Sequence, residues 1–187
     1  MRYKRWLLVA SFLFVIGFGG GLTAGLATPG GVADLFSEDV TALEEFANLL
    51  ASLPQSSVFF LILVKNTSAV LISFALSPIF CLTPVMALIL NGGLIGYVSV
   101  LVIQENSLGY LLAGLLPHGI FELPALIMGE AVSLSFGTAV LMALIKKERR
   151  SQLLPHLRQN LRYLLIALTL FLPAAIIETY ITPLFLR

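Results

Sequence analysis

A histidine and a glutamate stand four residues apart in a long apolar stretch, as His118 and Glu122 of the segment His-Gly-Ile-Phe-Glu-Leu-Pro. Four residues make slightly more than one helical turn, so both side chains lie on the same face if the segment is helical. Ionisable groups are costly inside a bilayer, and those found there usually face a partner, a cavity or a pathway. The spacing therefore predicts a polar site within a membrane-spanning helix.

Further ionisable and amide side chains interrupt the apolar stretches, namely Lys65, Asn66, Asn91, Glu130 and Glu178. From their positions in the predicted spans, Lys65 and Glu178 are expected at the same depth as His118 and Glu122. We therefore expect Glu178 to join the histidine and the first glutamate, with the lysine and the two asparagines as a supporting polar shell. Glu130 is counted with this supporting shell, although it follows Glu122 by eight residues, which turns its face by roughly 80° around a helix and favours a separate contact.

Three interpretations of this cluster remain open. In the first, Lys65 pairs with Glu122 or Glu178 and fixes the register of the helices. In the second, His118, Glu122 and Glu178 bind a divalent metal such as zinc, and an open position holds a reactive water, as in a metal-dependent hydrolase. In the third, the same groups relay protons or bind a small solute or a lipid headgroup in a transporter.

The composition places the chain among polytopic membrane proteins. Hydrophobic residues make up 58% of the 187 positions and charged residues only 11%, whereas soluble domains average roughly 45–50% and about 25%. A bilayer needs about 20 apolar residues per helix, and five segments qualify: 6–26, 58–76, 84–103, 118–145 and 163–184. Pro117 is expected to break or kink a helix, so residues 108–116 are predicted to form a short re-entrant or interfacial helix. We expect one all-α membrane domain over residues 1–187.

Basic residues are concentrated on one side of the predicted membrane. Nine of the eleven precede the first span or lie between the fourth and fifth, and they are Arg2, Lys4, Arg5, Lys146, Lys147, Arg149, Arg150, Arg158 and Arg162. The segments on the other side carry acidic residues instead, which are Asp34, Glu38, Asp39, Glu44, Glu45 and Glu105. The positive-inside rule then predicts a cytoplasmic N-terminus and an external C-terminus. A net charge of +1 without a basic stripe argues against a nucleic-acid partner.

Residues 37–53 are predicted to form an external amphipathic helix. Apolar residues recur there at intervals of three and four, as Val40, Leu43, Phe46 and Leu50. Such a helix lies on the membrane surface or offers a docking face to another membrane or extracytoplasmic protein.

Small residues repeat every four positions in two spans, as Gly17, Gly21 and Gly25 in the first and as Gly129, Ser133 and Gly137 in the fourth. Such ladders let helix backbones approach closely in lipid. They serve packing within one chain or homodimerisation, and we expect the protein to self-associate.

The polar residues also carry a resemblance to the stage II sporulation protein M family. The matching pieces are Lys65-Asn66, Asn91-Gly92 with Gly96, Pro117 to Pro124, and Ala174 to Pro183. The resemblance covers the second span to the C-terminus and implies an all-helical integral membrane protein. It implies further that His118, Glu122 and Glu178 form a shared polar site. In spore-forming bacteria the family member anchors or organises peptidoglycan-degrading partners, so we expect a membrane scaffold or partner-binding protein, with the metal enzyme and the transporter as alternatives.

Overall fold

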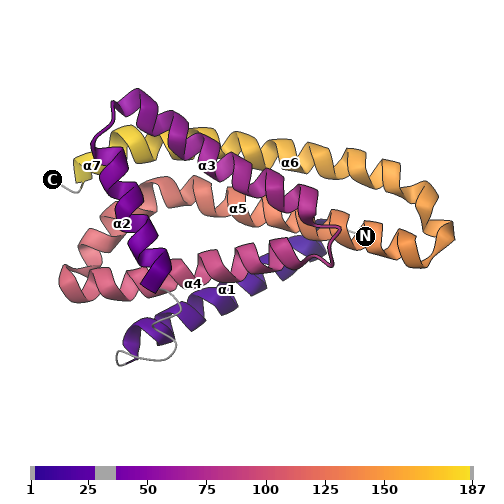
Figure 1. Cartoon of the computed structure of the whole chain (residues 1–187), viewed down its shortest axis with the longest axis horizontal. Coiled ribbons are helices and arrows are strands. Elements are labelled where there is room, and N and C mark those ends of the chain that lie inside the picture. Colours follow the sequence, from indigo (N-terminus) through magenta and orange to yellow (C-terminus); the bar gives the residue numbers. More distant parts are fainter. Residues whose placement is uncertain (1–2, 28–36, 186–187) are drawn as a thin grey trace.

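The computed structural model describes residues 3–27 and 37–185, which are almost entirely helical (Figure 1). The helices are α1 (Tyr3–Leu26), α2 (Ser37–Ala51), α3 (Gln55–Leu76), α4 (Leu82–Glu105), α5 (Leu108–Ile145), η2 (Lys147–Gln152), α6 (Leu153–Ile176), η3 (Ile177–Ile181) and α7 (Thr182–Phe185). Within the described residues, five helical stretches are long and apolar enough to cross a membrane: α1, α3, α4, α5 and the run from η2 to α7. The predicted all-α membrane architecture is confirmed.

The structure corrects the prediction at Pro117, because helix α5 continues through this residue. Residues 108–116 are therefore the first turns of α5, and they do not form a separate re-entrant helix before a span that begins at His118. A proline removes one backbone hydrogen bond and bends a helix, but the turns on both sides can remain bonded. In Figure 1 the first turns of α5 run across the end of the bundle, and the rest follows its long axis.

Helix α6 begins at Leu153, well before the start at Tyr163 that hydropathy predicts. Its first turns carry Arg158 and Arg162, so they do not count toward an apolar span. Pro155 lies in the first turn, where its missing N–H leaves no helical hydrogen bond unmade. The helix thus extends beyond its apolar part at the basic end of the chain.

Helix α5 lies at the centre of the bundle, between the pair α1 and α4 on one side and the pair α3 and α6 on the other (Figure 1). One buried apolar cluster joins α1, α4 and α5 through Phe14, Leu88 and Leu134. A second cluster joins α3, α5 and α6 through Val70, Val132 and Phe171. The residues of the predicted polar site therefore lie on α5, the most buried of the five candidate spans, and on the helices packed against it.

Both ladders of small residues are used for packing within the chain. Gly17 and Gly21 contact the backbones of Ile89 and Gly93 on α4, and Gly25 contacts Val100. In the second ladder, the glycines contact α3 and the turn that follows it: Gly129 meets Val70, and Gly137 meets Ser77 and Cys81. Ser133 is buried and donates a hydrogen bond to the Gly129 carbonyl. Self-association would therefore have to use other surfaces.

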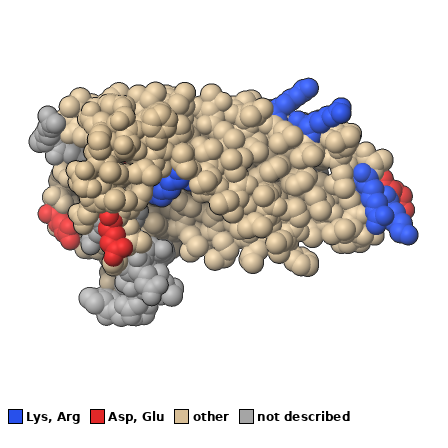
Figure 2. Space-filling view, turned by 45° about the horizontal axis from the view of Figure 1, so that its top comes forward, with Lys and Arg blue, Asp and Glu red and all other residues tan. Residues whose placement is uncertain are grey.

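Charge separates along the long axis of the molecule. Figure 2 shows Lys and Arg mainly toward one end of the visible face, and Asp and Glu mainly at the other. Helix α2 crosses the long axis near the end that holds α7 (Figure 1), and its Val40, Phe46 and Leu50 are half-buried. These positions suit an amphipathic helix at a membrane surface. Arg2 and Asp34 lie outside the described residues.

Candidate functional site

His118 and Glu122 are neighbours on one face of α5, as their spacing predicts. His118 Nε2 lies 3.7 Å from Glu122 Oε2, and both side chains are partly buried. Pro117 and Pro124 flank the pair within the helix. The bend of α5 thus lies at the same level as the two ionisable groups.

Glu178 reaches the same place from the other end of the chain. It lies in the π-helical segment η3, where the Thr182 N–H donates to the Ile177 carbonyl five residues back. Pro183 follows directly, and its missing N–H prevents ordinary α-helical bonding to the Thr179 carbonyl. Single π-turns of this kind are frequent at functional sites. One ligand atom each of His118, Glu122 and Glu178 lies within 4.8 Å of the others, so the structure brings the three predicted groups together.

The three side chains line a cavity of about 320 Å³ between α3, α4, α5 and η3. Lys65, Asn91 and Ser99 supply further polar atoms to its wall, and leucine, isoleucine and valine side chains make up most of the rest. Ligand pockets are commonly lined in this way, mostly by apolar side chains with a few polar groups that fix the orientation of the ligand. The arrangement can therefore hold a cation or a small polar group within the bundle.

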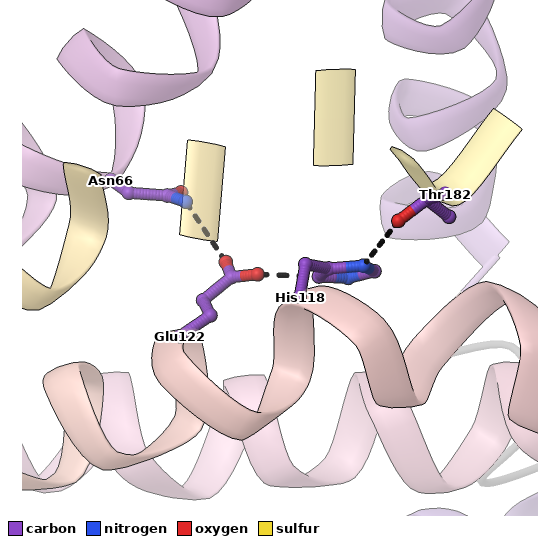
Figure 3. A network of polar contacts seen from close by, with 4 residues as sticks. All are labelled: Asn66, His118, Glu122 and Thr182. Atoms are coloured by element: carbon purple, nitrogen blue, oxygen red, sulfur yellow. Dashed lines mark hydrogen bonds and ion pairs between the residues drawn. The ribbon is translucent and has the colours of Figure 1, made fainter. Parts of the chain in front are cut away.

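Two further side chains orient the histidine and the glutamate (Figure 3). Asn66 Nδ2 donates a hydrogen bond of 2.9 Å to Glu122 Oε1. Thr182 Oγ1 lies 3.4 Å from His118 Nδ1, which leaves Nε2 on the side of Glu122 (Figure 3). Thr182 was not among the residues predicted for the site. Its position four residues after Glu178, about one helical turn further along the same segment, could have indicated that it lies near the site.

Lys65 lines the cavity without forming the predicted ion pair. Among the residues that the structure describes, it makes no direct ion pair with Glu122 or Glu178. Its Nζ lies 4.8 Å from the centroid of the Phe46 ring on α2, a cation–π geometry. Asn91 also faces the cavity, but its amide donates to the Ala87 carbonyl of its own helix.

Glu130 does not belong to the supporting shell with which it was counted, because it lies apart from this cavity. It is buried between α3 and α5, and Ser73 Oγ donates a hydrogen bond to its carboxylate. Its separation from Glu122 follows from the rotation that eight residues produce around a helix.

Replacing Ser73 by alanine should destabilise the protein by about 1–3 kcal/mol, because the buried Glu130 carboxylate would lose its donor. Thermal unfolding of the purified protein in detergent measures this change. Ser77→Ala is the matched control, since Ser77 is also buried but, among the described residues, its hydroxyl donates to the carbonyl of Phe74, three residues back. Equal unfolding midpoints for the two variants would contradict the interpretation.

The sequence matches a family of known proteins. A family profile described as Stage II sporulation protein M matches residues 9–183. Two relatives come from Methanocaldococcus jannaschii. Uncharacterized protein MJ0793 is 30% identical over 65% of this chain and 69% of its own length, and Uncharacterized protein MJ0706 is 32% identical over 48% of each.

No solved structure matches the chain. The family profile covers α3, α4 and α5 completely and most of the first and last candidate spans, including the segments that carry His118, Glu122 and Glu178. The chain therefore belongs to the stage II sporulation protein M family.

Proposed function

We propose that this multi-pass membrane protein binds a divalent metal ion, zinc or a similar ion, through His118, Glu122 and Glu178. The observation that carries the proposal is the approach of their three ligand atoms to within 4.8 Å of one another, from two segments far apart in sequence. Imidazole nitrogens and carboxylate oxygens are both zinc ligands, and catalytic zinc sites use three protein ligands.

Electrostatics favours a cation in this place. Two carboxylates close together in a partly buried site repel each other, and buried charges are normally neutralised. Lys65 supplies only one positive charge, without direct contact to either glutamate among the described residues. A divalent ion balances both carboxylates at once, and the neutral imidazole adds a third ligand without adding charge.

Three protein ligands leave a coordination position for water, which is the arrangement of catalytic zinc sites. A metal ion in such a position polarises a substrate oxygen and generates a hydroxide nucleophile near neutral pH. We therefore propose a metal-dependent hydrolase that acts within the membrane. Asn66 and Thr182 would hold Glu122 and His118 in place, as partners of metal ligands commonly do.

Cobalt(II) titration of purified, chelator-treated protein tests the metal site directly. We expect saturation at one ion per chain, with the intense visible absorption of four- or five-coordinate cobalt, and displacement by zinc. Absence of saturable binding would overturn the proposal. Metal-free protein that catalyses pH-dependent solute uptake into liposomes would instead support a proton-coupled carrier.

Replacing Asn66 by leucine, which has nearly the same volume, should lower zinc affinity about 10- to 100-fold, as loss of a partner to a metal ligand usually does. Competition with a chelator of known affinity measures the change. Asn91→Leu is the matched control, because Asn91 faces the same cavity but does not contact a proposed ligand among the described residues. A similar loss in both variants would argue against a specific role of the Asn66–Glu122 hydrogen bond.

We further propose that the N-terminus is cytoplasmic and that the metal site lies toward the external side. The separation of charge along the molecule supports this orientation. Cysteine labelling of intact cells at Glu45 and at Glu148, after Cys81→Ser, tests it. Only the cysteine at position 45 should react with a reagent that does not cross the membrane.

Partner binding through α2 is a second candidate function. This helix lies outside the five candidate spans, and the side chain of Leu49 on it is 51% exposed. A photo-crosslinking residue at position 49 should then give one adduct of defined mass, which would be twice the mass of the chain if the partner is a second copy. The matched control is position 60, where Phe60 is 61% exposed within α3. Adducts of many different masses at both positions would contradict the proposal that α2 binds a specific partner.

A further inference from the structure

An apolar groove runs along the outside of the bundle, next to the polar cavity. It has a volume of about 490 Å³ and lies between α1 and α5. Leu7 and Ser11 form one wall, and residues of α5 from Leu115 to Ile127 form the other. Its α5 wall includes Ile120, which is 64% exposed. Because both helices are candidate membrane spans, lipid is the natural neighbour of this surface.

The groove and the polar cavity share a wall. Leu115, Gly119 and Leu123 line both spaces. Gly119 has no side chain to close this wall, and a Cβ atom there would meet only the two leucine side chains, at 3.9–4.0 Å. His118, the neighbour of Gly119, belongs to the polar cavity. The two spaces are therefore separated at one point by little more than the backbone of a glycine and two flexible side chains.

With the proposed divalent ion in place, the polar cavity offers net positive charge to a ligand, because the ion and Lys65 together outweigh the carboxylates of Glu122 and Glu178. Lys65 lines it and has no direct ion pair with the glutamates among the described residues. The proposed metal ion adds a second cationic group, whose open position suits an oxygen ligand. An anionic phosphate oxygen fits both groups, and an adjoining apolar groove fits a hydrocarbon chain.

We propose that this site binds a membrane lipid with an anionic phosphate headgroup, the headgroup in the cavity beside Lys65 and a hydrocarbon chain in the α1–α5 groove. The proposal rests on the proposed function, because without the metal ion the carboxylates of Glu122 and Glu178 outweigh Lys65 in the cavity. It names the class of ligand that the centre takes, and it assigns a role to Gly119 as the point at which headgroup site and chain site meet.

Photo-crosslinking with two lipids tests the proposal. The probes are phosphatidic acid and phosphatidylcholine, each with a diazirine in one acyl chain, presented in nanodiscs of otherwise unlabelled phosphatidylcholine. Peptide mapping by mass spectrometry should place the phosphatidic acid adduct on α5 between Leu115 and Ile127. We expect this adduct to exceed the phosphatidylcholine adduct about fivefold, the preference that one lysine gives for an anionic headgroup. Lys65→Met should reduce the ratio toward one.

Variants of the shared wall and the groove give the second readout. Gly119→Phe should remove the selective adduct, whereas Gly119→Ala should retain it, because a methyl group fits within ordinary contact distances. Ile120→Trp, at an exposed position, should fill the groove from outside without disturbing the core. Leu165→Trp on α6 is the matched control, since Leu165 is 62% exposed and does not line this groove.

The metal content of every sample is measured in parallel, so the two proposals fail separately. Adducts spread equally over all lipid-facing helices, with no difference between the two lipids, would overturn the lipid site even if metal is bound. A selective adduct that depends on Lys65 and Gly119 in zinc-loaded protein, and that is lost after chelation, would support the lipid site, whereas absence of bound zinc would overturn the metal centre.

Discussion

Replacing Gly21 by alanine should destabilise the protein by about 1–3 kcal/mol, the usual cost of forcing a methyl group into a packed core. A Cβ atom at this position would overlap the carbonyl of Gly93 and approach the backbone nitrogen of Tyr97 on α4. These are backbone atoms, so they cannot rotate away as the end of a side chain can. Helices α1 and α4 would have to separate, and Gly17 would then also lose its contact with Ile89.

Gly20→Ala is the matched control for this prediction. Gly20 has no atom within 4 Å of its Cβ direction, and alanine favours a helix over glycine by about 0.8–1.0 kcal/mol. The two variants change neighbouring residues of the same helix in the same way, yet we expect opposite shifts. Thermal unfolding in detergent, followed by the fluorescence of Trp6, measures both. Equal midpoints would show that the glycine face of α1 is not packed against α4.

Glu178→Gln should lower the affinity for zinc at least about 100-fold, because loss of a ligand costs no less than loss of a partner that orients one. The amide keeps the size of the side chain but removes the charge that attracts the ion. His118→Ala and Glu122→Gln should have the same effect, since a three-residue site loses a third of its ligands in each case. Elemental analysis and chelator competition measure stoichiometry and affinity.

Glu130→Gln provides the control within the same helix. This carboxyl group is buried and accepts a hydrogen bond from Ser73, a contact that glutamine can keep. Its metal content should equal that of the unmodified protein. Zinc affinity should fall as the pH is lowered, because the ligands bind in their deprotonated forms. A zinc content that survives all three ligand variants, or disappears in Glu130→Gln as well, would exclude the proposed centre.

The spans and the local geometry of α5 could be predicted from the sequence because they depend on short-range rules. An apolar run of sufficient length predicts a spanning helix, and the four-residue interval between His118 and Glu122 places them on one face. The same rules predict that Glu130 lies on another face, as the structure finds. They failed at Pro117, because the sequence alone did not show that the helix continues beyond the bend.

Contacts between helices could not be predicted in this way. The Gly17–Gly21 ladder was compatible with a second copy of the chain as well as with α4, since a small-residue face fits any closely approaching helix. Similar depth suggested that Lys65 would pair with a glutamate, but depth does not determine the direction of a side chain. In the structure its ammonium group lies against Phe46 of α2.

The amino-acid sequence by itself determined the five spans, the separation of charge and the His118–Glu122 pair, because each depends on residues close together along one helix. Only the tertiary structure decided that Glu178 joins them, that Asn66 and Thr182 hold them, and that a cavity and an apolar groove meet at Gly119. The reason is physical. In lipid, the choice of neighbouring helix depends on how closely backbones can pack, and this choice brings residues distant in sequence to within a few ångströms.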